Sequence, residues 1–143
     1  MRLVALFFLA FLFVSCNKDK RYLSSYSMTV YINGDSSWTS SNVITTVDNG
    51  SVTISGSGQY SYQQVDITMT PYEGINQYLI SNSISATNTG SAFFIGQSAA
   101  GSVASSPNSG YIKISKVTAA GLYGTFYFPS VLGEVNGSFF APL

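Results

Sequence analysis

The chain contains no histidine, a single cysteine and only 8% charged residues in a length of 143. Without histidine, it can form neither a Ser-His-Asp or Cys-His nucleophile system nor a His-ligated zinc site. One cysteine can form neither an internal disulfide nor a cysteine-rich metal site. We therefore expect no metal and no cofactor. The length provides for one ordinary domain and is too short for two well-packed ones.

Positive charge is scarce in the part of the chain that is expected to fold. From residue 26 onward, two lysines stand against five carboxylates and leave a net charge of −3, while residues 1–25 carry +3 and restore the neutral total. The folded part has no run of basic residues that could displace counterions from phosphates. Nucleic-acid binding is therefore not expected.

Residues 1–15 have the pattern of a signal peptide. Arg2 precedes an apolar run of twelve residues, 3–14, where a membrane-spanning helix needs about 20. We expect an N-terminal signal helix that is removed on export. The run ends in Phe-Val-Ser before Cys16, which resembles the lipobox of bacterial lipoproteins, in which the cysteine is lipidated and becomes the new N-terminus. The alternative is an ordinary signal peptide followed by a free or paired thiol at Cys16.

Lipidation of Cys16 would make the mature protein membrane-bound without a spanning segment. Several acyl chains of the palmitate type, each contributing about 0.8 kcal/mol per buried methylene, exceed what stable anchoring requires. Residues 16–25 are then the lipidated cysteine and a polar tether, which is either a plain spacer or a sorting signal. We expect an outer-membrane location. The sequence leaves open the periplasmic or cell-surface face and the oligomeric state.

Residues 26–143 are predicted to form a single all-β domain, because apolar residues recur with the two-residue period of strands. Met28, Val30 and Ile32 alternate with polar neighbours before Asn-Gly at 33–34, and Asp-Asn-Gly at 48–50 marks a second hairpin turn. About nine strands are predicted, at residues 28–32, 43–47, 51–55, 64–70, 77–80, 92–96, 111–117, 122–128 and 135–140.

Strands at this spacing, with no helical stretch of ten residues, predict an antiparallel β-sandwich or a partly open barrel. The Ser/Asn/Thr-rich residues 81–91 are predicted to connect two strands. Residues 97–110, almost wholly Gly, Ala, Ser, Pro and Asn, are predicted to be a mobile loop, and a linker is favoured over a binding loop.

The last two predicted strands echo each other. Gly-Thr-Phe-Tyr-Phe-Pro at 124–129 recurs as Gly-Ser-Phe-Phe-Ala-Pro at 137–142. Glycine allows a ring or backbone to approach closely, the phenylalanines are candidates for the core, and proline is expected to end the strand pairing. A single echo of this length indicates a hairpin.

Several of these segments together resemble small lipoproteins of the Bacteroidota, in the family known as domain of unknown function 6252. The resemblance rests on the signal peptide with its lipobox, Met-Thr-Val-Tyr-Ile-Asn-Gly at 28–34 leading to Trp38, the strand at 111–116, Gly-Thr-Phe at 124–126 and the closing Gly-Ser-Phe before Pro142. It covers most of the mature chain. It implies a single-domain, all-β outer-membrane lipoprotein and brings no catalytic residues.

The five carboxylates do not form a recognisable catalytic pair. Asp35 and Asp48 lie in predicted turns, and Asp66 falls on the solvent face of its strand. Glu73 and Glu134 are separated by about sixty residues. We therefore expect a non-catalytic protein, either a binding domain or a structural component of the cell envelope. The alternative is a glycan-active hydrolase, which needs two acids about 5 to 10 Å apart across a cleft.

Aromatic residues make up 15% of the chain and are its one marked excess. Exposed rings can stack on sugar faces or anchor a protein partner, so Trp38, Tyr60 and Tyr62 are candidate ligand-stacking residues and a glycan or an envelope protein is the candidate partner. Tyr60 and Tyr62 are two apart and are expected to face the same side. The alternative is that tyrosine is simply a good strand residue that tolerates half-burial.

Overall fold

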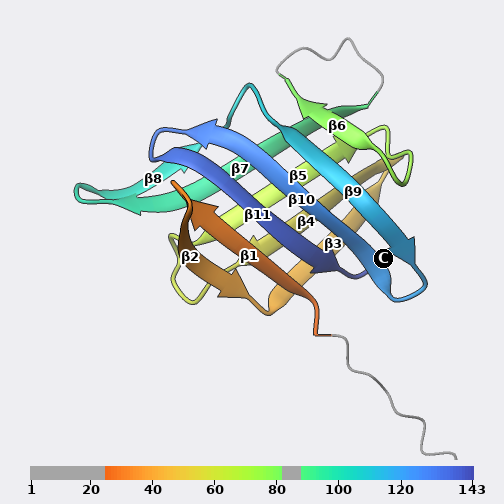
Figure 1. The fold of residues 1–143 in the computed structure, drawn as a ribbon, viewed down its shortest axis with the longest axis horizontal. Coiled ribbons are helices and arrows are strands. Elements are labelled where there is room, and N and C mark those ends of the chain that lie inside the picture. The colour runs from red at the N-terminus through yellow and green to blue at the C-terminus, as the bar shows by residue number, and fades with distance from the viewer. Residues whose placement is uncertain (1–24, 82–87) are drawn as a thin grey trace, which may run out of the picture.

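The computed structural model describes residues 25–81 and 88–143, and its regular structure there is entirely β-strand (Figure 1). The predicted signal peptide, Cys16 and the tether up to residue 24 lie outside the described residues. The all-β class is confirmed. The eleven strands are β1 (Ser27–Ile32), β2 (Asp35–Ser40), β3 (Asn42–Asp48), β4 (Ser51–Ser57), β5 (Gln64–Thr70), β6 (Gln77–Ile80), β7 (Thr89–Ser98), β8 (Gly101–Ser105), β9 (Tyr111–Thr118), β10 (Gly121–Ser130) and β11 (Gly133–Ala141).

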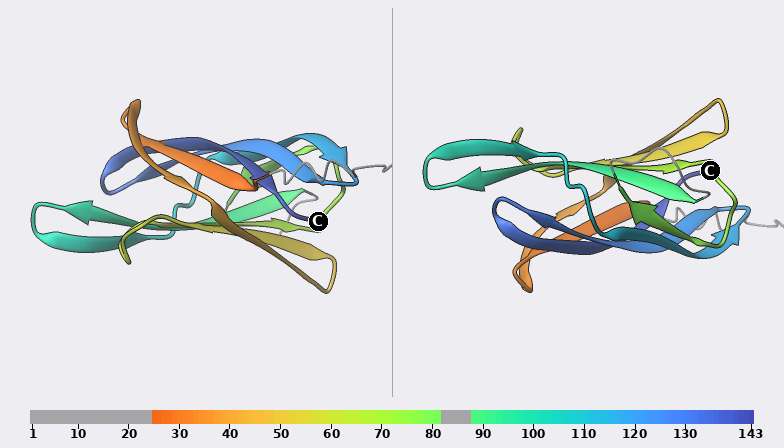
Figure 2. Two further views of the ribbon diagram at one scale, coloured as in Figure 1. Left: turned by 90° about the horizontal axis from the view of Figure 1, so that it is seen from below. Right: turned by 90° about the horizontal axis from the view of Figure 1, so that it is seen from above.

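The strands form two layers that face each other (Figure 2). One layer has the order β2-β1-β11-β10-β9, and the other has the order β7-β5-β4-β3 with β8 beside β7. The short strand β6 joins them, because it pairs antiparallel with β9 and parallel with β7. The fold is thus a sandwich whose layers are continuous along one side, which places it between the two predicted architectures. The β6–β7 ladder corrects the expectation of purely antiparallel pairing in the described part of the chain.

Alternating apolar residues from both layers fill one core. Val65, Ile67 and Met69 of β5 are fully buried, while the residues between them face outward. Met28 and Val30 of β1 are buried in the same way. Each such side chain contributes about 1.5–3 kcal/mol on burial. The predicted two-residue period is therefore confirmed, and it explains why these segments are strands.

The repeated sequence at 124–129 and 137–142 forms two reciprocal glycine–phenylalanine contacts between β10 and β11. Gly124 lies opposite Phe139, and Phe126 lies opposite Gly137. A Cβ atom on either glycine would lie under 3.0 Å from the ring of the facing phenylalanine. Both phenylalanines are almost fully buried. The glycines therefore make room for the two rings that fill the centre of the core.

Two hairpins turn on Asn-Gly pairs, as predicted. Asn33 and Gly34 have φ values of 53° and 84°, and Asn49 and Gly50 have values of 47° and 78°. Positive φ at both central residues is what a tight two-residue turn requires. Asn33 also joins two turns, because its Nδ2 donates to the Leu132 carbonyl at 3.2 Å and its Oδ1 accepts from the Glu134 N–H at 3.1 Å.

Two further sequence predictions are wrong. Residues 97–110 are not a mobile loop throughout, because they contain the end of β7 and all of β8, which pair antiparallel. Backbone hydrogen bonds to a neighbouring strand stabilise a segment whose small residues give no strand pattern. Pro129 does not end the pairing of β10, where it lies opposite Glu134. Because β9 pairs with β10 only up to Tyr127, no strand needs the N–H that Pro129 lacks.

Candidate functional site

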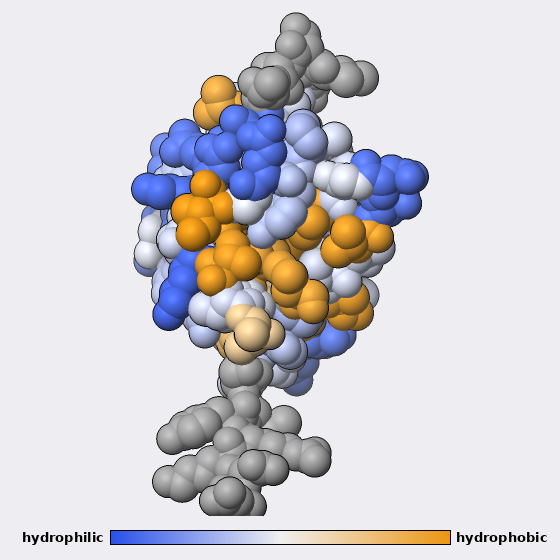
Figure 3. All heavy atoms as spheres, turned by 90° about the vertical axis from the view of Figure 1, so that its right-hand side faces the viewer, coloured by the Kyte–Doolittle hydropathy of each residue, from blue (hydrophilic) through white to orange (hydrophobic). Residues whose placement is uncertain are grey.

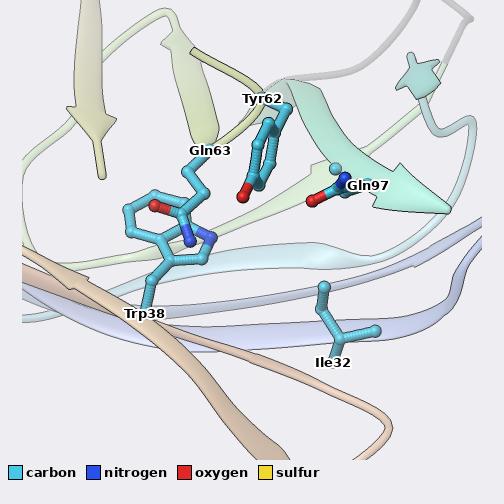
Figure 4. Close-up of a pocket in the computed structure, with 6 residues that line it drawn as sticks. Ile32, Trp38, Tyr62, Gln63 and Gln97 are labelled. Carbon is cyan, nitrogen blue, oxygen red and sulfur yellow. The ribbon is translucent and has the colours of Figure 1, made fainter. Parts of the chain in front are cut away.

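A cavity of about 250 Å³ lies at the end of the sandwich where β1 and β7 terminate. Its walls come from both layers, from β1 and β2 on one side and from β7 and the β4–β5 connection on the other (Figure 4). We call it the Trp38 pocket. The lining residues are Ile32, Trp38, Tyr62, Gln63, Gly96 and Gln97.

Trp38 is held in β2 opposite Val30 of β1, which directs its indole toward the core. Only 8% of the side chain is exposed, so the ring forms a wall of the pocket and not a free stacking platform. Its indole N–H makes no hydrogen bond to another described residue and is not a buried unpaired group, so it is open to solvent. The indole N–H is therefore a donor that a ligand in the pocket could use.

Tyr60 and Tyr62 lie in the connection between β4 and β5, residues 58–63. This connection is closed by a hydrogen bond from the Gly58 N–H to the Gln63 carbonyl at 2.8 Å and one from the Gln63 N–H to the Tyr60 carbonyl at 2.9 Å. The two tyrosine rings stack with centroids 5.1 Å apart and an interplanar angle of 6°. The expectation that they share a side is confirmed. Tyr62 lines the pocket, whereas Tyr60, which is 51% exposed, is not part of the lining.

Two glutamine side chains add polar groups to the aromatic walls, and sequence reasoning missed both. Gln63 and Gln97 both line the pocket, and Figure 4 shows their side chains together with Trp38 and Tyr62. Gln63 Oε1 accepts from the Tyr60 N–H at 3.2 Å, which leaves its Nε2 without a partner among the described residues. No charged residue lines the pocket. In the sequence, only the position of Gln63 directly after Tyr62 could have indicated that Gln63 lies in the pocket.

Gly96 allows β7 to pack closely against its neighbours beside the pocket. A Cβ atom at this position would meet the side chains of Leu132 and Phe94 at under 3.0 Å. The strand therefore passes close to the facing layer, and its backbone forms part of the pocket wall.

None of the five carboxylates of the domain lines the Trp38 pocket. Asp66 and Glu134 lie on the outer faces of different layers, where Asp66 Oδ2 accepts from Gln64 Nε2 at 2.7 Å and Glu134 Oε1 accepts from the Tyr127 hydroxyl at 3.1 Å. Asp66 is half-buried, not fully solvated as its strand position predicts, and its Oδ1 has no partner. Asp35 is the first residue of β2 and Asp48 is the last residue of β3, so both lie in strands next to the two Asn-Gly turns and not in the turns, where they were predicted.

No family model matches the chain, and neither the curated proteins nor the solved structures contain a match. The resemblance to Bacteroidota lipoproteins therefore stays a prediction. Within residues 25–81 and 88–143 there is no helix long and apolar enough to cross a membrane. The same residues contain no group of three or more acidic or cysteine side chains that could hold a metal ion.

Proposed function

We propose that this chain is a non-catalytic, lipid-anchored outer-membrane protein whose Trp38 pocket binds a neutral sugar ring of a glycan. The observation that carries the proposal is the convergence of two aromatic side chains and two amides on one uncharged cavity. The predicted lipobox at Cys16 supports the membrane location.

The chemistry of the pocket suits a sugar better than an ionic or a purely apolar ligand. A sugar ring has a face of C–H groups, which packs on the electron-rich face of an aromatic ring. Its hydroxyls donate and accept hydrogen bonds, and each glutamine amide supplies both functions. An uncharged pocket gives no compensation for burying a charged ligand. The volume of about 250 Å³ is just below the usual range for drug-sized ligands, about 300–1,000 Å³, and so suits a single ring.

The exposed ring of Tyr60 extends this surface beyond the cavity. Because it stacks on Tyr62 and is half exposed, it offers a further aromatic face beside the pocket for the next sugar of an oligosaccharide. The hydrolase alternative is less favoured, because a glycosidase needs a carboxylate at its cleft and the pocket lining has none.

A glycan array tests the ligand class. The mature protein is expected to retain neutral oligosaccharides, and Tyr62→Ala is expected to weaken retention by at least about tenfold, as loss of a central aromatic contact does. Gln97→Ala is expected to weaken it by about three- to tenfold, the effect of one hydrogen bond. The matched control is Tyr111→Ala, which also removes a half-buried stacked ring, from Tyr127 at 5.9 Å, but outside the pocket.

Circular dichroism of each variant checks that it is folded. Equal loss of retention in Tyr62→Ala and Tyr111→Ala would contradict the pocket assignment, as would exclusive retention of acidic glycans. The anchor is tested separately by mass spectrometry of the mature N-terminus from membrane fractions. A lipidated Cys16 is expected, and an unlipidated N-terminus in the soluble fraction would show that the anchor proposal is wrong.

A further inference from the structure

Exposed apolar side chains gather at the end of the sandwich opposite the Trp38 pocket. Val47, Ile75 and Leu143 are 66%, 66% and 68% exposed, and Val117 is 37% exposed. We call this group the apolar end. Figure 3 looks onto this end and shows hydrophobic surface spread across it.

The apolar end is built from segments that are distant in the sequence. The β3–β4 turn is joined to the segment after β5 by the hydrogen bond from the Tyr72 N–H to the Gly50 carbonyl at 2.8 Å. The Thr45 hydroxyl donates to the Pro142 carbonyl at 2.6 Å and so fixes the C-terminus beside β3. Four separate segments therefore each contribute an exposed apolar side chain to the apolar end. Such a group differs from the single exposed apolar residues that are normal on a protein surface.

Three aromatic rings and one cation border the apolar end, with Phe140 and Tyr123 on the outer face of the β1 layer and Tyr26 packed partly against the core. Phe140 lies between Tyr26 and Tyr123, with ring centroids 5.1 and 4.2 Å away. Lys116 Nζ lies 5.4 Å from the centre of the Tyr123 ring. Lys116 and Lys113 are the only basic residues after residue 26. Tyrosine rings beside lysine are typical of the headgroup layer of a membrane.

The chain enters the domain at this same end, because β1 begins beside the last residues of β11 (Figure 1). Nine residue steps separate Cys16 from Ser25, where the described chain begins, and they span at most about 32 Å when fully extended. The nine residue steps of β10 alone span about 30 Å. A lipid on Cys16 therefore keeps the start of β1, at the apolar end, within about 32 Å of the bilayer, while the Trp38 pocket lies at the far end of the strands.

We propose that the apolar end docks on the phospholipid bilayer that holds the anchor, so that the Trp38 pocket points away from the membrane. In this arrangement Val47 and Ile75 enter the boundary between headgroups and acyl chains, Tyr26 and Tyr123 lie among the headgroups, and Lys116 faces anionic lipid phosphates. The inference rests on the proposed lipidation of Cys16. It goes beyond the proposed function because it fixes the orientation in which the pocket is displayed.

Site-specific fluorescent labels test the docking. The lipidated mature protein, whose Cys16 thiol is blocked, is reconstituted into vesicles of phosphatidylethanolamine and phosphatidylglycerol. An environment-sensitive thiol label is placed through Val47→Cys or, in a second variant, Ile75→Cys. The matched control is Val131→Cys, which replaces a valine that is 71% exposed in the β10–β11 turn at the opposite end.

Brominated lipids are expected to quench the labels at positions 47 and 75 at least about twofold more than the label at 131, because the former lie at the acyl boundary. Equal quenching at both ends, in protein that floats with the vesicles, would overturn the docking and leave the anchor intact. Protein that does not float with the vesicles would refute the anchor and the docking together. A blue shift at 47 that depends on protein concentration without vesicles would assign the apolar end to a second copy instead.

Discussion

Replacing Gly137 by alanine tests the glycine–phenylalanine packing at the centre of the core. A Cβ atom at this position would lie under 3.0 Å from both the Phe126 ring and the Thr29 carbonyl oxygen. The ring can shift slightly, but the carbonyl belongs to the neighbouring strand β1 and can move only with it. Overpacking of this kind costs about 1–3 kcal/mol. Because alanine also restricts the unfolded chain, which returns about 0.4–1 kcal/mol, we expect a net loss of about 1–2 kcal/mol.

Gly56→Ala is the matched control, because Gly56 is also a buried glycine within a strand. The atoms nearest to a Cβ there all belong to the flexible side chain of Met28, which can change rotamer. We expect its free energy of unfolding to stay within about 1 kcal/mol of the wild type. Urea denaturation measures both variants through the fluorescence of Trp38, the sole tryptophan. A Gly137→Ala protein as stable as the wild type, or an equal loss in Gly56→Ala, would refute the packing argument.

The turns and one buried tyrosine give two further predictions. Asn49→Ala is expected to lower the free energy of unfolding by about 1 kcal/mol, because alanine tolerates positive φ poorly. Asn33→Ala is expected to lower it by about 1–2 kcal/mol more, because the side-chain hydrogen bonds to Leu132 and Glu134 are also lost. Equal losses in urea denaturation would contradict this difference. Burial raises the pKa of the Tyr78 hydroxyl above its usual value, so the unfolded chain ionises first as the pH passes about 10 and the folded state loses stability from there upward. Tyr78→Phe is therefore expected to show a shallower decline of the melting temperature above pH 10, and an unchanged slope would show that Tyr78 does not contribute.

The sequence predicted those parts of the fold that depend on local patterns. The period-two alternation located β1, β5 and β9, because each of these strands has one face in the core. The Asn-Gly pairs located two turns, because few other residues accept positive φ. Neither signal exists for β8, whose small residues are held only by pairing with β7. Strands of this kind are defined by their neighbours and cannot be found from their own composition.

The candidate site was predicted in part. The aromatic excess led to Trp38 and to the Tyr60–Tyr62 pair, and the fold brings Trp38 and Tyr62 to one cavity. The sequence could not show that Trp38 is largely buried, because the position of β2 beneath the second layer follows from long-range packing. Gln97 was unpredictable for the same reason, since it reaches the pocket only through the arrangement of β7 against β2.

A fluorescence titration of Trp38 with neutral oligosaccharides tests the central claim most directly. Because Trp38 is the sole tryptophan and forms a wall of the pocket, its emission reports on this site alone. We expect a saturable change in emission that is insensitive to salt, since the pocket has no charged lining, and that is lost in Tyr62→Ala but kept in Tyr111→Ala. Calorimetric binding of the same sugar with no change in Trp38 emission, and with full affinity in Tyr62→Ala, would contradict the account.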